Sequence, residues 1–160
     1  MSDALQVYLH DHLAGARFAV EHLGYLKQQT GDAELARLAE SLLTEVESDV
    51  DVLRKLIDQV GDSSFDLKQA AGWIAEKAGR LKLHHEKVGL GTFEALELLS
   101  LGILGKSALW RVLPILAAAD KRIPNLNFAM LAERALSQFA RVESHRLRVA
   151  VSAFNPAPAH

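Results

Sequence analysis

The sequence predicts an all-α protein built as a four-helix bundle. Apolar residues recur at alternating steps of three and four through four long segments, which is the pattern of one buried face on each of four helices. Only four prolines occur in 160 residues, and glycine and aspartate mark the breaks between segments. The long segments are of similar length, as the helices of a bundle are.

The first two segments predict an antiparallel hairpin. Asp3 is the expected cap of the first helix and Gly31 its end, whereas Asp32 caps the second helix and Gly61 ends it. The tight Gly-Asp link leaves room only for a sharp reversal of the chain. The expected buried face of the first helix comprises Leu5, Leu9, His12, Ala16, Ala19, Leu23 and Leu26, and that of the second Ala39, Leu43, Val46, Val50, Leu53, Ile57 and Val60.

The second half predicts a crossover and another hairpin. A shorter amphipathic segment spans about 66–83, a third long helix runs from Thr92 to about Ala119, and a fourth from about Asn125 to Phe154. The third helix is leucine-rich around most of its circumference, so we expect it to be the most buried, and Pro114 to bend its last turn. The expected buried face of the fourth helix comprises Phe128, Ala132, Ala135, Phe139, Val142, Arg146 and Val149.

The spacing of these elements predicts one domain over residues 1–154, followed by a flexible tail over 155–160. About 30 residues join the two hairpins, enough for a helical crossover between helices 2 and 3 that travels the length of the bundle. That connectivity is ferritin-like. A plain up-down-up-down bundle with an extra helix on its side fits the pattern nearly as well.

Composition excludes several function classes. The formal charge is −2, and the 18 basic residues are mixed with 20 acidic ones, so no footprint for nucleic acid or anionic lipid is expected. Cysteine is absent, which excludes thiol catalysis and disulfides. The N-terminus lacks the pattern of a signal peptide, and Lys106 and Arg111 interrupt the longest uncharged stretches. We therefore expect a cytoplasmic protein that does not cross a membrane.

Polar residues on predicted buried faces are the candidates for function. His12 lies on the first helix's apolar face, and Glu45 and Asp49 lie on a stripe of the second that is otherwise leucine and valine. His12 and Asp49 stand at almost the same height, which predicts a contact between them. On the fourth helix, Glu143 and Arg146 are one turn apart. These five residues are predicted to form a buried polar network, with His12 a hydrogen-bonded core histidine rather than a ligand.

The spacing argues against a di-iron centre. Such a bundle needs Glu-x-x-His on two helices, but Ser48 follows Glu45 and Arg146 follows Glu143 where the histidines should stand. Arginine does not ligate metals in proteins. We therefore expect no metal or other cofactor. The alternative is iron or manganese at a nonstandard site made of His12, Glu45, Asp49 and Glu143.

Other polar residues have simpler expected roles. Glu94 and Glu97 fall in the first turns of the third helix, where the dipole favours acids, so a capping role is expected for them. Lys106 is expected to pair with an acid. A Schiff-base role for Lys106 is the alternative. A pocket for a small apolar ligand is a further candidate, with Trp73, Lys106 and Trp110 at its mouth. The remaining histidines are expected at the surface: His10, His22, His84, His85 and His145.

Three stretches resemble a known family. YLHDHLAGA near the start, AAGWIAEKAGRLKL in the crossover and LELLSLGILGKSALW in the third helix are similar to a family of uncharacterised bacterial proteins of about 160 residues with ferritin-like topology. The likeness covers nearly the whole chain and implies the fold, not an activity. The general ferritin-like motif is matched only by Glu45 and Glu143, and the missing histidines count against oxidase, oxygenase and iron-storage activity.

These observations lead to two functional expectations. The first is a binding or self-associating protein, most simply a homodimer, without an intact di-iron centre. The leucine-rich third helix exposes few charges and is the face expected to pair with a second copy. The second is a metal-binding or redox protein that uses the nonstandard site. The sequence offers no catalytic nucleophile arrangement, which favours a protein that is not an enzyme.

Overall fold

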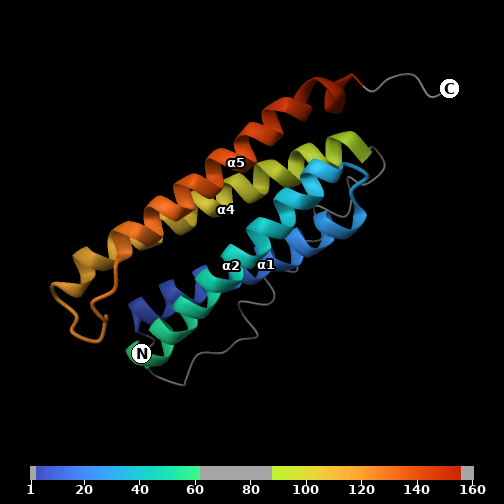
Figure 1. Ribbon diagram of the computed structural model, residues 1–160. Coiled ribbons are helices and arrows are strands. Elements are labelled where there is room, and N and C mark those ends of the chain that lie inside the picture. The colour runs from blue at the N-terminus through green and yellow to red at the C-terminus, as the bar shows by residue number, and fades with distance from the viewer. Residues whose placement is uncertain (1–2, 62–87, 156–160) are drawn as a thin grey trace.

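The protein is an all-α four-helix bundle (Figure 1). The computed structural model describes residues 3–61 and 88–155. Four helices occupy these residues: α1 (Ala4–Gln29), α2 (Ala33–Val60), α4 (Val88–Ala117) and α5 (Phe128–Phe154). The expected crossover helix over 66–83, together with Trp73, His84 and His85, lies outside the described residues.

The first hairpin has the predicted caps. The Asp3 carboxylate accepts a hydrogen bond from the Leu5 N–H at 3.0 Å, and Asp32 accepts bonds from the first turn of α2 at 2.8 and 3.2 Å. Gly61 ends α2 at φ 40°, in the left-handed region that favours glycine. Thr30, rather than Gly31, caps the end of α1, so that boundary was predicted one residue late.

The boundaries of the second hairpin differ more from the prediction. Helix α4 begins at Val88, four residues before the predicted Thr92, and contains Pro114 in its last turn. Helix α5 begins at Phe128, because the Asn127 side chain accepts a hydrogen bond from the Met130 N–H at 3.1 Å and so caps the helix there. The DKRIPN connection therefore extends three residues further than predicted.

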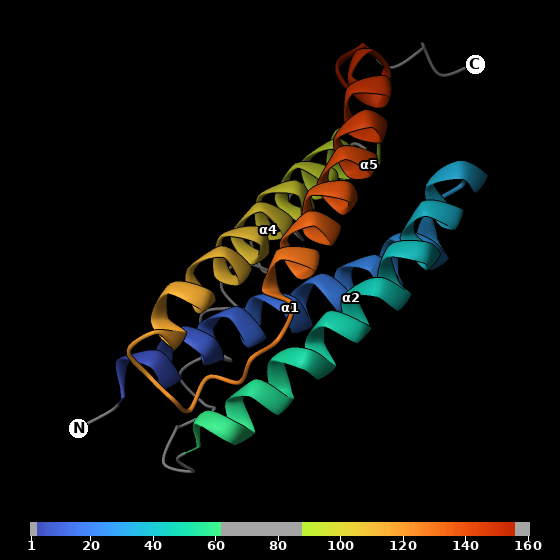
Figure 2. The same cartoon turned by 60° about the vertical axis from the view of Figure 1, so that its left-hand side comes forward.

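The two hairpins meet with α2 and α4 running in the same direction, as both ribbon views show (Figures 1 and 2). Arg122 in the α4–α5 connection pairs with Asp3 and donates a hydrogen bond to the Val60 carbonyl at 3.3 Å. The end of α4 therefore lies at the same end of the bundle as the end of α2. A plain up-down-up-down order would require the opposite direction for α4.

The core lies between the hairpins and draws on all four helices. Fully buried side chains include Leu9 of α1, Leu56 of α2, Leu113 of α4 and Ala135 of α5. Each helix presents such residues at three- and four-residue steps, as predicted. Within each hairpin the helices pack closely, whereas contacts between the hairpins are fewer.

Helix α4 is apolar on both its inner and its outer face. Leu96, Leu99 and Leu113 are buried, whereas Leu101 and Ile115 are 60% and 71% exposed. The prediction that this helix is the most buried is therefore wrong for its outer face. Among the described residues it is the one helix, over Leu90–Ala117, that is long and apolar enough to cross a membrane by length and composition, a property that core helices of soluble proteins share.

Candidate functional site

Ion pairs join α2 to α5 along their length. Three arginines of α5 stand at intervals of seven residues and so share one face of the helix. Arg134 pairs with Asp49, Arg141 with Glu45 at 2.6 Å, and Arg148 with Glu34 at 2.5 Å. As the arginine numbers rise, the acid numbers fall, because α2 and α5 are antiparallel. The three ion pairs therefore link α2 and α5 at three levels of the bundle.

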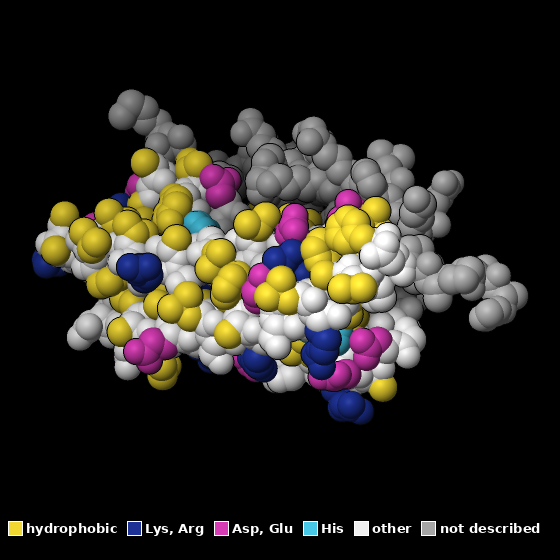
Figure 3. All heavy atoms as spheres, turned by 90° about the horizontal axis from the view of Figure 1, so that it is seen from above, with side chains coloured by type: hydrophobic (Ala, Val, Ile, Leu, Met, Phe, Trp, Pro, Cys, Tyr) yellow, Lys and Arg dark blue, Asp and Glu magenta, His cyan; other side chains and the backbone are white. Residues whose placement is uncertain are grey.

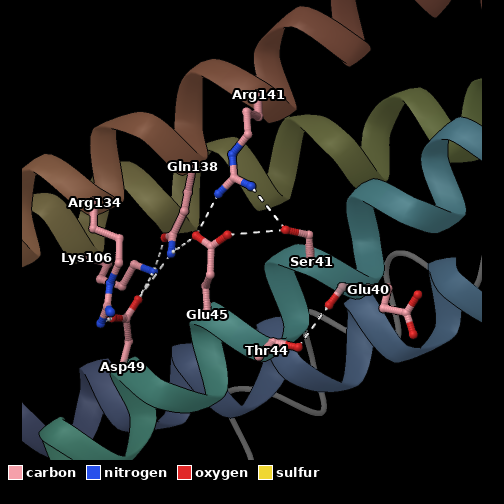
Figure 4. Close-up of polar contacts among 9 residues, drawn as sticks. All are labelled: Glu40, Ser41, Thr44, Glu45, Asp49, Lys106, Arg134, Gln138 and Arg141. Atoms are coloured by element: carbon pink, nitrogen blue, oxygen red, sulfur yellow. Dashed lines mark hydrogen bonds and ion pairs between the residues drawn. The ribbon is translucent and has the colours of Figure 1, made fainter.

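Asp49 is the buried centre of this interface (Figure 4). Its side chain is 3% exposed, and its two carboxylate oxygens meet two cations. Arg134 contacts Oδ1, and Lys106 Nζ of α4 lies 2.5 Å from Oδ2. A buried carboxylate is tolerated because both oxygens are hydrogen-bonded to charged donors.

Gln138 connects Asp49 to Glu45. It is fully buried, its amide oxygen accepts from Lys106, and its amide nitrogen donates to Glu45 at 3.1 Å (Figure 4). Arg141 and Ser41 complete the hydrogen bonds to Glu45. We call Glu45, Asp49, Lys106, Arg134, Gln138 and Arg141 the polar cluster.

The environment shifts the pKa of two members of the polar cluster. Burial lowers the pKa of the Lys106 ammonium below its usual value, and the neighbouring Asp49 carboxylate opposes this effect. Burial acts to raise the pKa of Glu45, but hydrogen bonds from Arg141 and Gln138 outweigh it and leave that pKa lowered. Glu45 is therefore ionised at neutral pH.

A cavity of about 340 Å³ lies beside the polar cluster, between α1, α2 and α4. Asp11, His12, Asp49 and Lys106 supply its polar wall, and the rest of the wall is mainly apolar. Asp11 and Gly102 line it and are exposed, so the cavity reaches the surface. Its lining includes Ala16, Ala19, Val46, Leu53, Ile103, Leu109 and Trp110.

Three glycines inside helices line this cavity: Gly15 of α1, and Gly102 and Gly105 of α4. Among the described residues, a Cβ built on any of them would meet no atom within 4 Å beyond its own local helix. Close approach of another described helix is therefore not what requires a glycine at these positions. Each costs helix stability and leaves space in or beside the cavity.

Of the three residues predicted at the mouth of a pocket, Lys106 and Trp110 both line the cavity. Trp110 is 1% exposed and stacks on Phe128 with ring centroids 6.3 Å apart. Its indole N–H has no hydrogen-bond partner among the described residues. The third predicted residue, Trp73, lies outside the described part of the chain.

The predicted five-residue network is divided in the structure. Glu45 and Asp49 belong to the polar cluster, whereas His12 lines the cavity and contacts the Tyr8 ring, with centroids 4.7 Å apart. His12 and Asp49 share the cavity wall, but no hydrogen bond joins these two described residues. Burial lowers the pKa of His12, and Asp11 partly opposes this effect. The imidazole is therefore mainly neutral at neutral pH.

Glu143 and Arg146 form a second cluster, which lies between α5 and α4 rather than between α5 and α2. Arg146 donates to Glu143 at 2.7 and 2.8 Å, bonds to Glu97 at 3.1 Å and lies 5.0 Å from the centre of the Phe93 ring. These bonds join the two helices of one hairpin. Since α4 begins at Val88, Glu94 and Glu97 stand beyond its first turn, and the capping role predicted for them is wrong.

The described residues contain no group of three or more His, Cys, Asp or Glu side chains placed to hold a metal ion. The alternative ligand set of His12, Glu45, Asp49 and Glu143 is spread over the cavity wall and the two clusters. Arginine or lysine contacts each of its three carboxylates. Cations at these positions oppose a bound metal ion.

The prediction that His145 lies at the surface is wrong. It is 2% exposed, its Nδ1 lies 2.9 Å from Arg148 Nη2, and its Nε2 lies 3.2 Å from the Asp32 carboxylate. Since arginine only donates, Nδ1 is the acceptor and Nε2 carries the ring proton. His10 and His22 are half-buried, and His22 contacts the Ala95 carbonyl at 3.3 Å.

Sequence reasoning missed Arg134, Gln138 and Arg141 as site residues. A signal for them exists, because Ala135, Gln138, Val142 and His145 continue the three- and four-residue steps from Phe128 and Leu131. The predicted face followed a neighbouring stripe through Phe139 and Arg146. Both stripes are rich in apolar residues, and the structure buries the one that contains Gln138 most completely.

Fold and site together define an all-α bundle with a side cavity and an ion-paired interface. Comparisons of the chain with protein-family models, with curated proteins and with solved structures give no match.

Proposed function

We propose that the protein binds a small, mainly apolar carboxylate in the cavity between α1, α2 and α4. The observation that carries the proposal is a cavity of about 340 Å³ lined by Lys106 and Trp110, whose N–H donors are not all matched by acceptors among the described residues. Pockets for small ligands are typically apolar with a few placed polar groups, and about 300 Å³ is the lower end of their range. A ligand of modest size fits this description.

The donors are Lys106 and Trp110. The Lys106 ammonium has three N–H groups, and Asp49 and Gln138 accept two of them. The described residues provide no acceptor for the third, nor for the Trp110 indole N–H. A ligand that brings an acceptor oxygen would satisfy buried donors that otherwise cost stability.

Charge favours a carboxylate over a neutral acceptor. The polar cluster contains three cations, Lys106, Arg134 and Arg141, against two carboxylates, Glu45 and Asp49. Its formal balance is therefore +1. A single negative charge on the ligand, bound beside Lys106, would neutralise this excess.

The three cavity glycines support the same proposal. A helix-interior glycine costs roughly 1 kcal/mol relative to alanine, and an alanine Cβ would be accommodated at each of these positions. Space beside the cavity is therefore kept at the expense of helix stability. Such a pattern is typical of a site where a ligand approaches the backbone closely.

The proposal places the protein among cytoplasmic ferritin-like bundles that bind without a di-iron centre. The common direction of α2 and α4 supports ferritin-like connectivity. The ion pairs of Glu45 with Arg141 and of Glu143 with Arg146 support the absence of the centre.

Fluorescence of Trp110 tests the proposal. In a Trp73→Phe background, decanoate below its micelle concentration is titrated, with decanol and decylamine as matched neutral and cationic probes. We expect decanoate to change the Trp110 emission and raise the melting temperature. Ligand at one hundred times its Kd adds about 2.7 kcal/mol to the free energy of unfolding.

Variants make this test specific. Lys106→Met and Gly105→Leu should abolish the decanoate response, the first by removing the donor and the second by filling the cavity. Gly24→Leu is the matched control, because Gly24 is a helical glycine with open space that does not line the cavity. No response to any probe, or a stronger response to decylamine than to decanoate, would refute the proposal.

A further inference from the structure

The outer face of α4 carries a stripe of side chains that the bundle leaves exposed. Its spacing of four, three, four, three and four residues is the pattern by which helices pair in coiled coils. Leu101 is 60% exposed, Leu104 39% and Ile115 71%. The stripe comprises Glu97, Leu101, Leu104, Ala108, Arg111 and Ile115, all exposed.

The surrounding surface is also apolar. Figure 3 looks onto the side of the molecule where α5 and α4 lie and shows apolar side chains over much of it, with charged side chains between them. On α5, Leu136 is 47% exposed and Leu147 59%. Monomeric proteins rarely leave large contiguous patches of this kind in water, and such patches mark interaction sites.

The two charged residues of the stripe stand at equal distances from Leu104. Glu97 stands seven residues before Leu104 and Arg111 seven residues after it, so each is two turns away on the same face. A second α4 laid antiparallel, with the two-fold axis near Leu104, brings Glu97 of each copy opposite Arg111 of the other. A parallel copy would set glutamate against glutamate and arginine against arginine.

Both charged residues have bonding capacity left. Glu97 is 55% exposed and uses only Oε2 in its bond to Arg146. Arg111 is exposed and makes no ion pair within the described residues, unlike Arg134, Arg141 and Arg148. The stripe therefore offers one acid and one base, and in a two-fold dimer the acid of each copy can face the base of the other.

We propose that the protein forms an antiparallel homodimer through the outer face of α4, with Leu104 at the two-fold axis and two Glu97–Arg111 ion pairs between copies. Apolar burial of Leu101, Leu104 and Ile115 supplies the attraction, and the ion pairs fix the direction and register. This interface is on the opposite side of α4 from the core-facing residues that include Trp110. Its test is thus independent of ligand binding.

Sedimentation velocity over a concentration series tests the dimer. We expect the wild type to dimerise and Leu104→Glu to be monomeric, because the substitution places two carboxylates at the axis. Leu126→Glu is the matched control: Leu126 is also 39% exposed but lies in the α4–α5 connection. A monomeric wild type, or a Leu104→Glu variant that still dimerises, would overturn the proposal.

Charge exchange tests the antiparallel register. Glu97→Lys and Arg111→Glu should each raise the dimer dissociation constant about tenfold or more by setting like charges together. An equimolar mixture of the two variants should form heterodimers, because every cation of one variant then faces a carboxylate of the other. The intrachain bond from Glu97 to Arg146 is not restored by mixing, so recovery reports the interface alone.

Two results of these experiments would contradict the inference. Failure of the mixture to recover association would reject the antiparallel register. Flotation of monomeric wild type with phosphatidylcholine vesicles would assign the stripe to a membrane surface instead. Circular dichroism of each variant verifies that the bundle remains folded.

Discussion

Asp49 of α2 and Lys106 of α4 meet with Oδ2 and Nζ 2.5 Å apart, and their side chains are only 3% and 13% exposed. The pair links the two hairpins where the cavity and the α2–α5 interface meet at Asp49. Buried ion pairs contribute little net stability over apolar residues of similar size, but loss of one partner is costly. The Asp49–Lys106 pair is therefore expected to fix how the two hairpins meet more than to add net stability.

Removal of one partner should destabilise the fold strongly. Asp49→Leu leaves Lys106 and Arg134 without their shared carboxylate, and we expect a loss of about 3 kcal/mol or more in the free energy of unfolding. The double variant Asp49→Leu/Lys106→Met should recover part of this loss, because the buried ammonium is gone. Urea unfolding of the two single variants and the double variant measures the coupling. Additive losses in the double variant would show that the two side chains do not interact.

Alanine at a cavity glycine should stabilise the unliganded protein. Gly15→Ala adds a methyl group where no atom lies within 4 Å, and alanine favours a helix over glycine by about 1 kcal/mol. Gly24→Ala is the matched change in the same helix, away from the cavity, and should gain a similar amount. Thermal unfolding monitored by circular dichroism measures both. A destabilised Gly15→Ala variant would mean that the position is closely packed.

His12 should make the fold less stable in mild acid. Burial lowers its folded-state pKa below 6.5, so in the window between that lowered value and 6.5 the unfolded chain binds a proton that the folded chain does not. The free energy of unfolding therefore falls as the pH drops through this window. His10 is shifted in the same direction, chiefly by burial, and must be removed separately.

Urea unfolding at about pH 5 and pH 7 checks this prediction. His12→Gln should reduce the difference in stability between the two pH values, and His10→Gln provides the comparison. The result that counts against it is a His12→Gln variant whose pH dependence equals that of the wild type.

The sequence was sufficient for the helices but not for the pairing of their polar side chains. Aspartate caps and apolar steps are local, so the bounds of α2 could be predicted to the residue from Asp32 and Gly61. Glu45 and Asp49 could also be identified, because carboxylates on an apolar stripe require partners. Their partners depend on how α5 is rotated about its axis, and its two apolar stripes left that rotation undetermined.

The start of α4 could not be predicted from the sequence, for a different reason. Gly89 and Gly91 look like loop residues in the sequence, yet the helix includes both. Propensity is a weak predictor where tertiary packing stabilises a helix. Because the helix begins earlier than predicted, Glu97 lies beyond its first turn, and its carboxylate pairs with Arg146.

Replacement of Gln138 should measure how much the hydrogen bonds of the polar cluster contribute to the stability of the fold. It is fully buried, accepts from Lys106 and donates to Glu45 and, at 3.5 Å, to Asp49. Gln138→Leu keeps an apolar body of similar size but leaves Lys106 with one acceptor fewer and Glu45 with one donor fewer. Each buried group left unsatisfied costs about 1–3 kcal/mol, so we expect a loss in that range or above.

Gln138→Glu distinguishes hydrogen bonding from charge at this position. A carboxylate there retains an acceptor for Lys106 but cannot donate to Glu45, and it places a third acid beside Glu45 and Asp49. If the +1 balance of the polar cluster attracts an anionic ligand, Gln138→Glu should weaken the decanoate response while Gln138→Leu leaves more of it. Paired urea unfolding and Trp110 titrations of the two variants measure this. A Gln138→Glu variant that responds to decanoate as strongly as the wild type would show that the charge of the polar cluster does not select the ligand.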